Sequence, residues 1–187
     1  GSCVFCDLNQ GDFKGNDLKG VDLRYTNLNG ANLSHVNLNG TILHHTNLSG
    51  ANLEGVDLSN KELTGVILHH TNLSGANLEG VDLSNKNLSG VNLHGVNLSN
   101  TNLNGSILHH ANLSGANLEG VDLSNTILNA AILHHANLSG ANLEGVDLRF
   151  ISNDLTGTIL HHANLSGANL EGVDLSNKDL SGTILEK

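Results

Sequence analysis

The chain has 187 residues with 3 Phe, 1 Tyr and no Trp, Met or Pro, so it lacks the large side chains that build a single thick hydrophobic core. Its formal net charge of -10 argues against direct binding of nucleic acid and leaves simple solubility or a basic partner as interpretations. The sequence has no apolar run of about 18 residues and no charged-then-apolar leader, which favours a cytoplasmic protein with no membrane association, although Gly1-Ser2 resembles an expression scar.

The first motif along the chain is a pair of cysteines, Cys3 and Cys6. A CxxC pair is a weak signal for redox or zinc chemistry here, because no second pair and no flanking βαβ pattern accompany it. When the downstream repeat is extended backwards, Cys3 falls on its leucine position and Cys6 lies two residues before Leu8. We therefore expect both to be small, buried core residues of the first coil.

Leucine, or once phenylalanine, recurs at every fifth residue from Leu8 to Leu148 and again from Leu155 to Leu185. This spacing fits neither the period of a helix nor that of a flat strand, so the chain must turn once per five residues to keep the leucines inside. We call the leucine position the centre of each unit. A small or β-branched residue precedes it by two positions, and Gly or Asn usually follows it by two, where a type II turn needs positive φ. Each unit is predicted to be one short strand and one corner, with Asn or Asp facing outward.

Units such as Ala51-Asn52-Leu53-Glu54-Gly55 and Ala141-Asn142-Leu143-Glu144-Gly145 resemble the A(D/N)LXX consensus of pentapeptide repeat proteins. The resemblance covers essentially the whole chain. It implies an all-β fold, a right-handed quadrilateral β-helix (β-solenoid) with four pentapeptides per coil, in a single domain spanning 1–187. The 36 units then form about nine coils, and at ~4.8 Å per coil the rod is ~43 Å long.

A longer motif, His-His-(Thr/Ala)-Asn-Leu-Ser-Gly, begins at residues 44, 69, 109, 134 and 161. The paired histidines suggest a metal-binding solenoid as one alternative function. However, pairs on the same face, such as those at His69 and His109, are expected two coils or roughly 10 Å apart, too far to share a zinc ion with ligands at about 2.1 Å. Corner residues that tolerate positive φ explain the histidines without a metal or cofactor.

Isoleucine replaces the outward Asn or Asp in seven units, and three of these replacements fall on one wall when units are counted in fours. A shared apolar wall predicts a surface for a protein partner or for self-association, although a β-branched residue that stiffens a strand explains it too. An isoleucine in the last unit suggests a homodimer formed through coil ends or walls. The candidate surface comprises Ile67, Ile107, Ile127, the neighbouring His69 and His109, and Ile184.

Leu148 and Leu155 are seven residues apart, so two extra residues must bulge at a corner near 149–154. Phe150 in this insertion is a candidate contact point, because irregular loops on rigid scaffolds often carry function. A tolerated insertion explains the same spacing.

Acidic residues gather on another wall, at Asp22, Glu62, Asp82 and Asp122. Some pentapeptide repeat proteins, the Qnr quinolone-resistance group and its mycobacterial relatives, act as DNA mimics that bind type II topoisomerases. The resemblance therefore implies an alternative function, binding or protecting DNA gyrase. The acidic edge is much sparser than a duplex, which carries one charge per ~1.7 Å of axis.

No catalytic constellation is evident, because a tube filled with leucine offers no cleft in which a nucleophile and its base could hold a substrate. We therefore predict a non-enzymatic, rigid protein–protein interaction scaffold whose protein partner the sequence does not identify. Lys61, Lys86 and Lys178 occupy the normally inward small position, where a charge is costly unless the amine reaches water.

Overall fold

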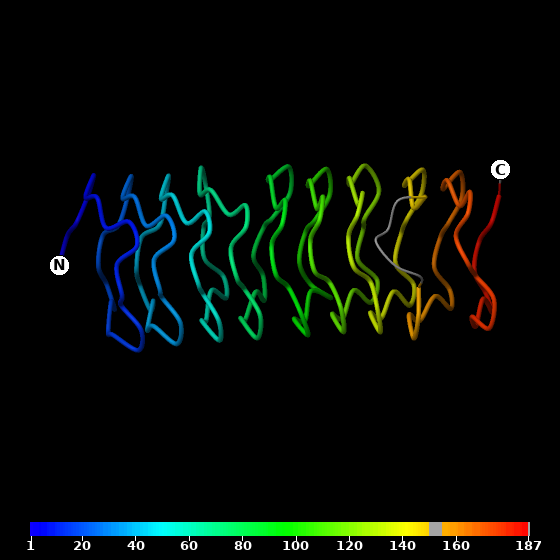
Figure 1. The fold of residues 1–187 in the computed structure, drawn as a ribbon, viewed down its shortest axis with the longest axis horizontal. Coiled ribbons are helices and arrows are strands. Elements are labelled where there is room, and N and C mark those ends of the chain that lie inside the picture. The colour runs from blue at the N-terminus through cyan, green and yellow to red at the C-terminus, as the bar shows by residue number, and fades with distance from the viewer. Residues whose placement is uncertain (150–154, 187) are drawn as a thin grey trace.

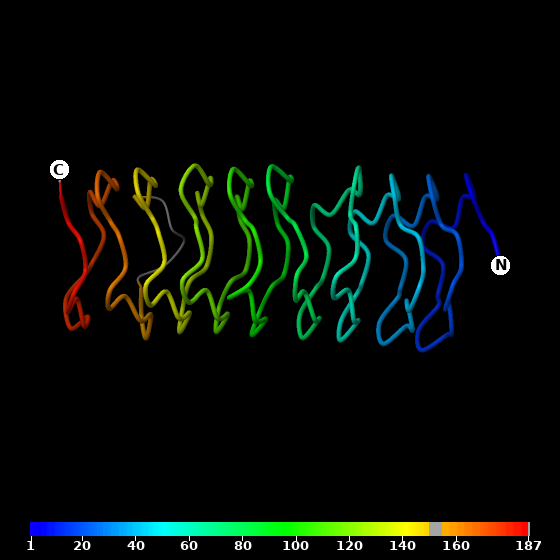
Figure 2. The same ribbon diagram turned by 180° about the vertical axis from the view of Figure 1, so that it is seen from behind.

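The computed structural model describes residues 1–149 and 155–186, which wind in stacked coils along an elongated rod (Figure 1). The N- and C-termini lie at opposite ends of the long axis, and the view from behind shows the same stacking (Figure 2). Up to residue 142, parallel bridges join residues 20 positions apart, as from Asn32 to Asn52 and from Asn52 to Asn72, and those that span the insertion join residues 22 apart. Four five-residue units therefore complete one coil, as the resemblance implies. The candidate contact point Phe150 lies outside the described residues.

In the part of the chain that the structure describes, extended structure is present only as isolated bridges. In residues 1–149 and 155–186 the chain forms no helix and no run of paired residues long enough to be a strand, which corrects the expectation of one short strand per unit. The N–H of Leu53 donates to the Asn72 carbonyl of the next coil (2.7 Å), and the N–H of Val56 closes the turn on the Leu53 carbonyl (3.2 Å). Because a corner recurs every five residues, a single bridging residue is left between turns. No helix in the described part of the chain has the length and apolar character needed to cross a bilayer.

The interior of the rod is filled by the centre leucines. From Leu23 to Leu165 each described one is at most 4% exposed, and most of the Ala, Val and Thr residues two positions earlier are buried as well. Each coil packs only against its two neighbours, so stability accumulates coil by coil. Full burial of one leucine contributes on the order of 1.5–3 kcal/mol.

The corners adopt the left-handed conformation that the turn chemistry predicts. The residue two positions after the centre has φ between 54° and 75° in every described unit except the one with Asn100. Several corners carry histidine, and their rings lie over a glycine of the next coil. A Cβ added to Gly90 would fall 2.2 Å from His70 Nδ1, so this glycine is needed for space as well as for its φ of +65°.

Candidate interaction surfaces

Three of the outward isoleucines fall in one register of the coils. Bridges from Asn87 to Ile107 and from Ile107 to Ile127 align these side chains, and the bridge from Asn47 to Ile67 places Ile67 in the same 20-residue register. Ile67 and Ile127 are 42% and 46% exposed, and Ile107 is half-buried. Three apolar side chains thus share one wall, which we call the isoleucine wall.

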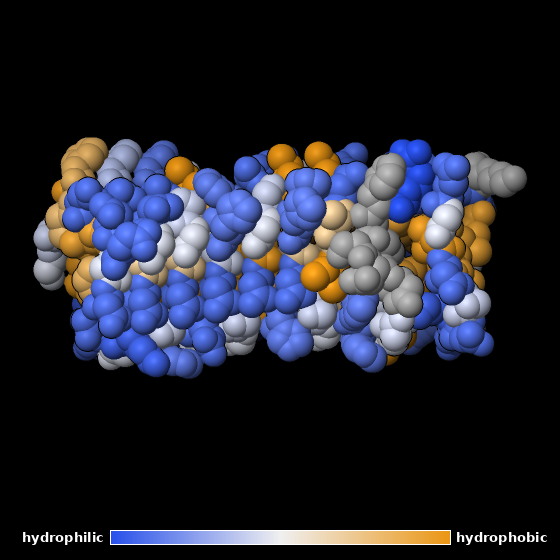
Figure 3. All heavy atoms as spheres, viewed as in Figure 1, coloured by the Kyte–Doolittle hydropathy of each residue, from blue (hydrophilic) through white to orange (hydrophobic). Residues whose placement is uncertain are grey.

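Polar ladders surround this wall. On the next wall the amide of Asn72 donates to Asn52 Oδ1 (2.8 Å), and the amide of Asn92 donates to Asn72 Oδ1 (2.9 Å). A regular row of hydrophilic side chains runs along the rod in Figure 3, whereas hydrophobic side chains form separate groups. The complete ladder consists of Asp12, Asn32, Asn52, Asn72, Asn92 and Asn112. An isoleucine side chain cannot form these hydrogen bonds, so the isoleucine wall differs chemically from the wall that carries the asparagine ladder.

Two histidine pairs lie at the corner beside the isoleucine wall. The rings of His69 and His70 have centroids 5.7 Å apart, and those of His109 and His110 are 4.1 Å apart. The Nδ1 atom of His109 lies 3.0 Å from the carbonyl oxygen of Asn129. The two pairs occupy separate coils, and among the described residues no three His, Cys, Asp or Glu side chains are grouped so that they could hold a metal ion.

Ile184 belongs to a different wall, because it bridges to Asn164 rather than to the register of Ile67. It is 47% exposed, and Leu185 beside it is 50% exposed. The candidate residues therefore do not form one continuous surface. The isoleucine wall and the C-terminal coil are separate apolar features.

Three carboxylates of the predicted acidic edge, Asp22, Asp82 and Asp122, accept hydrogen bonds within their own turns. Arg24 pairs with Asp22 through its Nη2 atom (2.7 Å) and holds the pKa of Asp22 below the ordinary value of 3.8. Asp122 accepts hydrogen bonds from the Ser124 hydroxyl (2.7 Å) and backbone N–H (3.0 Å), which lower its pKa in the same way. An outward Asp or Asn accepting from the N–H two residues later is the geometry of an Asx turn. Asp22 and Asp122 thus have a structural role within the rod, which explains them without a basic partner protein.

The inward lysines form hydrogen bonds to the backbone. Burial lowers the pKa of Lys86, and the charge of Asp82 opposes this effect. Threonine at the equivalent position makes the same kind of bond, as from Thr46 Oγ1 to the Leu23 carbonyl (2.8 Å). The three amines donate to carbonyls of the preceding coil, Lys61 to Thr41 (3.4 Å), Lys86 to Leu63 (2.7 Å) and Lys178 to Leu155.

Among the described residues bridges are absent at several steps of the ladder, including steps beside two of these lysines. Among the described residues no bridge joins Glu62 to Asp82 or Ile67 to Asn87, although bridges resume at Ile107. A cavity of about 310 Å³ lies here and is lined in part by two lysines, Lys61 and Lys86. The interruption passes through the isoleucine wall between its first and second isoleucines.

An aromatic stack that the sequence interpretation missed lies at the N-terminal end of the rod. The rings of Phe5 and Tyr25 are 4.8 Å apart and inclined by 10°, and those of Tyr25 and His45 are 4.9 Å apart and inclined by 1°. Phe5 is 75% exposed and Tyr25 is 48% exposed. The signal was available, because the three residues stand 20 positions apart at the same corner.

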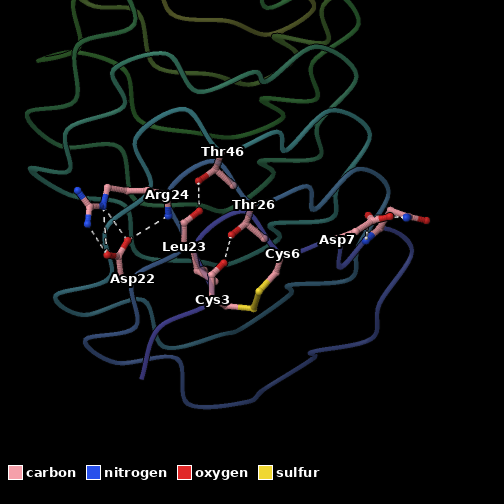
Figure 4. Close-up of a disulfide and its surroundings, with 9 residues drawn as sticks. Cys3, Cys6, Asp7, Asp22, Leu23, Arg24, Thr26 and Thr46 are labelled. Atoms are coloured by element: carbon pink, nitrogen blue, oxygen red, sulfur yellow. Dashed lines mark hydrogen bonds and ion pairs between the residues drawn. A yellow bond between two sulfur atoms is a disulfide. The ribbon is translucent and has the colours of Figure 1, made fainter.

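The two cysteines form a disulfide, with Cα atoms 5.4 Å apart (Figure 4). The expectation of two small, buried core residues holds only in part, since Cys3 packs against the core but both side chains are half-buried. Their covalent link was not predicted from the sequence. A separation of three residues across a corner brings their Cα atoms within the range that a disulfide needs. On the side of the next coil, the Thr26 hydroxyl donates to the Cys3 carbonyl (2.5 Å).

Comparisons with known proteins place this geometry among described folds. The family model of pentapeptide repeats matches residues 2–34, 17–55, 46–85, 87–125, 111–149 and 154–186. The chain is 34% identical to HetL, a pentapeptide repeat protein involved in heterocyst differentiation regulation from the cyanobacterium Nostoc sp. strain PCC 7120. The match covers 97% of this chain and 85% of HetL, with a TM-score of 0.40. It is 18% identical to full-length QnrB1, a plasmid-mediated fluoroquinolone resistance protein, over 100% of this chain and 92% of that one, with a TM-score of 0.54. No curated protein sequence matches the chain.

Proposed function

Because the chain belongs to the pentapeptide repeat family, whose solved members are right-handed β-helices, we propose that it is a non-enzymatic scaffold that binds a protein partner through the isoleucine wall. In this proposal 1–187 is a single domain of about nine coils. The observation that carries it is the shared register of Ile67 and Ile127, which are exposed, and Ile107, which is half-buried, on a rod whose outward positions are otherwise mostly Asn and Asp.

An isoleucine at an outward position lacks the hydrogen bonds that asparagine makes there. At an outward position Asn satisfies its own turn and the ladder, as Asn92 does by accepting from the His94 N–H (3.2 Å) and donating to Asn72 (2.9 Å). Each such bond contributes a net stabilisation of about 0.5–1.5 kcal/mol, which isoleucine cannot supply. Ile67 and Ile127 also leave 42% and 46% of their surface in water. A partner that covers this wall would recover the hydrophobic contribution that the free rod lacks.

Affinity capture with three versions of the chain tests the proposal. Wild type, Ile107→Asp and Ile159→Asp would be immobilised and exposed to extract from the source organism, and light scattering would report self-association of each. Ile159 is the matched control, because it is 44% exposed but bridges to Asn137 on a different wall. Loss of the partner, or of a dimer, with Ile107→Asp alone supports the isoleucine wall. If Ile107→Asp and Ile159→Asp retain or lose the partner equally, the isoleucine wall is not the binding surface.

The alternative, a DNA mimic that protects a type II topoisomerase, draws support from fold likeness to QnrB1 at a TM-score of 0.54. The engagement of Asp22 and Asp122 in local bonds favours the scaffold instead. A gyrase supercoiling assay with and without quinolone separates the two. Protection at micromolar concentration that survives Ile107→Asp would favour the mimic, and no effect would remove it.

A further inference from the structure

Three corners of the rod carry the dipeptide Asn-Gly, at residues 29–30, 39–40 and 104–105. In this dipeptide the glycine nitrogen attacks the preceding side-chain amide more readily than in other pairs, because glycine has no Cβ to hinder the approach. The φ angles of Gly30, Gly40 and Gly105 are nearly the same, at 64°, 66° and 68°. The corners therefore share their dipeptide and the conformation of its glycine, and they differ in what surrounds them.

The first of these corners holds both reactive groups in hydrogen bonds. The Nδ2 atom of Asn29 donates to the Ser49 carbonyl (2.8 Å) and to the Ser49 hydroxyl (2.7 Å). The Gly30 N–H donates to the same carbonyl (2.9 Å), and both residues of the dipeptide are half-buried. These bonds have to open before the Gly30 nitrogen reaches the Asn29 side chain.

The second corner lacks these bonds. Among the described residues, none accepts a hydrogen bond from the Asn39 side-chain amide or from the Gly40 N–H, and both residues are exposed. The acceptor equivalent to that of Gly30 is the Ser59 carbonyl. Asn39, Gly40 and Ser59 instead help to line a hollow of about 350 Å³. The nucleophile and the amide it attacks are thus unrestrained by hydrogen bonds and open to water at this corner.

The third corner is intermediate. The Nδ2 atom of Asn104 has longer bonds, to the Ser124 carbonyl (3.2 Å), the Ser124 hydroxyl (3.3 Å) and the Asp122 carboxylate (3.4 Å). The Gly105 N–H donates to no acceptor in the described part of the chain, and both residues of the dipeptide are half-buried. The structure therefore ranks the three sites by restraint, with Asn39 the least held and Asn29 the most.

We propose that Asn39 is a site of spontaneous covalent modification, at which the folded rod converts asparagine into aspartate or isoaspartate. The Gly40 nitrogen gives its proton to solvent and attacks Cγ of Asn39, and Nδ2 takes up a proton and leaves as ammonia. A cyclic succinimide results. Water then opens the ring, and cleavage of the new Cγ–N bond gives aspartate, whereas cleavage of the original peptide C–N bond gives β-linked isoaspartate.

Either product adds a negative charge to this corner. In the β-linked product the former backbone carbonyl of Asn39, which accepts the Gly20 N–H in the intact rod (2.8 Å), becomes a free carboxylate. The main chain also gains a carbon atom between the two coils' bonded groups. The next outward residue, Ile42, bridges to Asp22 rather than to the register of Ile67, so the modified corner is separate from the isoleucine wall.

Incubation of the intact, folded chain in mildly alkaline water enriched in heavy oxygen, followed by digestion and mass spectrometry, tests the proposal. The heavy isotope marks residues that react during incubation rather than during digestion. Asn29 and Asn39 lie between Arg24 and Lys61, so one tryptic peptide contains both and its fragments compare them directly. We expect Asn39 to react roughly ten-fold or more faster than Asn29, because several hydrogen bonds restrain Asn29 and each slows the attack by about two- to twelve-fold.

A variant and an unfolded control complete the experiment. Ser49→Ala removes one bond to Asn29, so it should speed the reaction there by about two- to twelve-fold and leave Asn39 unchanged. In concentrated urea the three sites should react at similar rates, because each has the same local sequence, Asn-Leu-Asn-Gly. Equal rates at Asn29 and Asn39 in the folded chain, or an order that persists in urea, would overturn the proposal. Products without isoaspartate would exclude the succinimide route, and an unchanged Asn29 rate in Ser49→Ala would contradict protection by these bonds.

Discussion

The imidazole of His45 lies over Gly65 of the next coil, so close that a Cβ added to Gly65 would fall 2.1 Å from His45 Nδ1. The same imidazole stacks on Tyr25 at 4.9 Å, so one corner connects three coils. Glycine at this corner is therefore required by its neighbour as well as by its own φ of +67°.

Gly65→Ala should destabilise the rod more than Gly95→Ala does. Both glycines have φ of +67°, so each substitution carries the left-handed backbone cost of about 1–2 kcal/mol, but a Cβ at Gly95 meets nothing within 4 Å. The added methyl at Gly65 must also displace His45 from Tyr25, which costs a further ~0.5–1.5 kcal/mol. Midpoints of urea unfolding measure the difference. This difference between the two substitutions should disappear in a His45→Ala background. Equal losses of stability from Gly65→Ala and Gly95→Ala in the wild-type background would contradict the role of the His45 contact.

Much of the rod was predictable, because every unit repeats the same local rule. The leucine step, the inward and outward positions and the left-handed corners all follow from five-residue chemistry. The number of units per coil did not follow from spacing, and required the family resemblance. Bridges such as Asn32 to Asn52 then show the 20-residue register directly.

The features that were missed depend on that register. Phe5 and Tyr25 can be recognised as stacked only once residues 20 apart are known to be neighbours. Lys86 donates to Leu63, 23 positions earlier, which no local pattern reveals. The cysteines differ, since three residues across a type II corner already bring two side chains on the same side close together. That pairing was within reach of the sequence.

Lys86→Thr should be tolerated, because threonine at this inward position makes the equivalent bond, as Thr46 does to Leu23 at 2.8 Å. The pH dependence should differ from wild type. Burial lowers the folded-state pKa of Lys86 below 10.5, so the unfolded chain holds more protons and wild-type stability rises as pH increases from the lowered value towards 10.5. Unfolding midpoints across this alkaline range should rise for wild type relative to the variant. Parallel curves would show that Lys86 has no effect.

Asp122 should stabilise the fold only while it is ionised. Hydrogen bonds from Ser124 hold its folded pKa below 3.8, so its contribution is present above 3.8 and is lost as pH falls through the lower folded value. Asp122→Asn keeps the turn bond, as Asn52 Oδ1 does with the Glu54 N–H (3.2 Å), and removes the titration. Thermal unfolding between neutral pH and pH ~2 should therefore show a smaller acid-induced loss in this variant. An unchanged loss would assign the acid sensitivity to other carboxylates.

Ile107→Asn should separate folding from binding. The new amide has Asn87 Oδ1 in the preceding coil as a hydrogen-bond acceptor, so we expect the free energy of unfolding to change by less than ~1 kcal/mol. Leu108→Ala, one residue later and 0% exposed, should instead lose about 2–5 kcal/mol through the cavity it leaves. If the isoleucine wall binds a partner, Ile107→Asn removes a buried apolar contact worth ~1–2 kcal/mol and weakens binding roughly five- to thirty-fold. Calorimetric unfolding and titration of the captured partner measure the two effects separately, and undiminished affinity would show that the partner binds elsewhere on the rod.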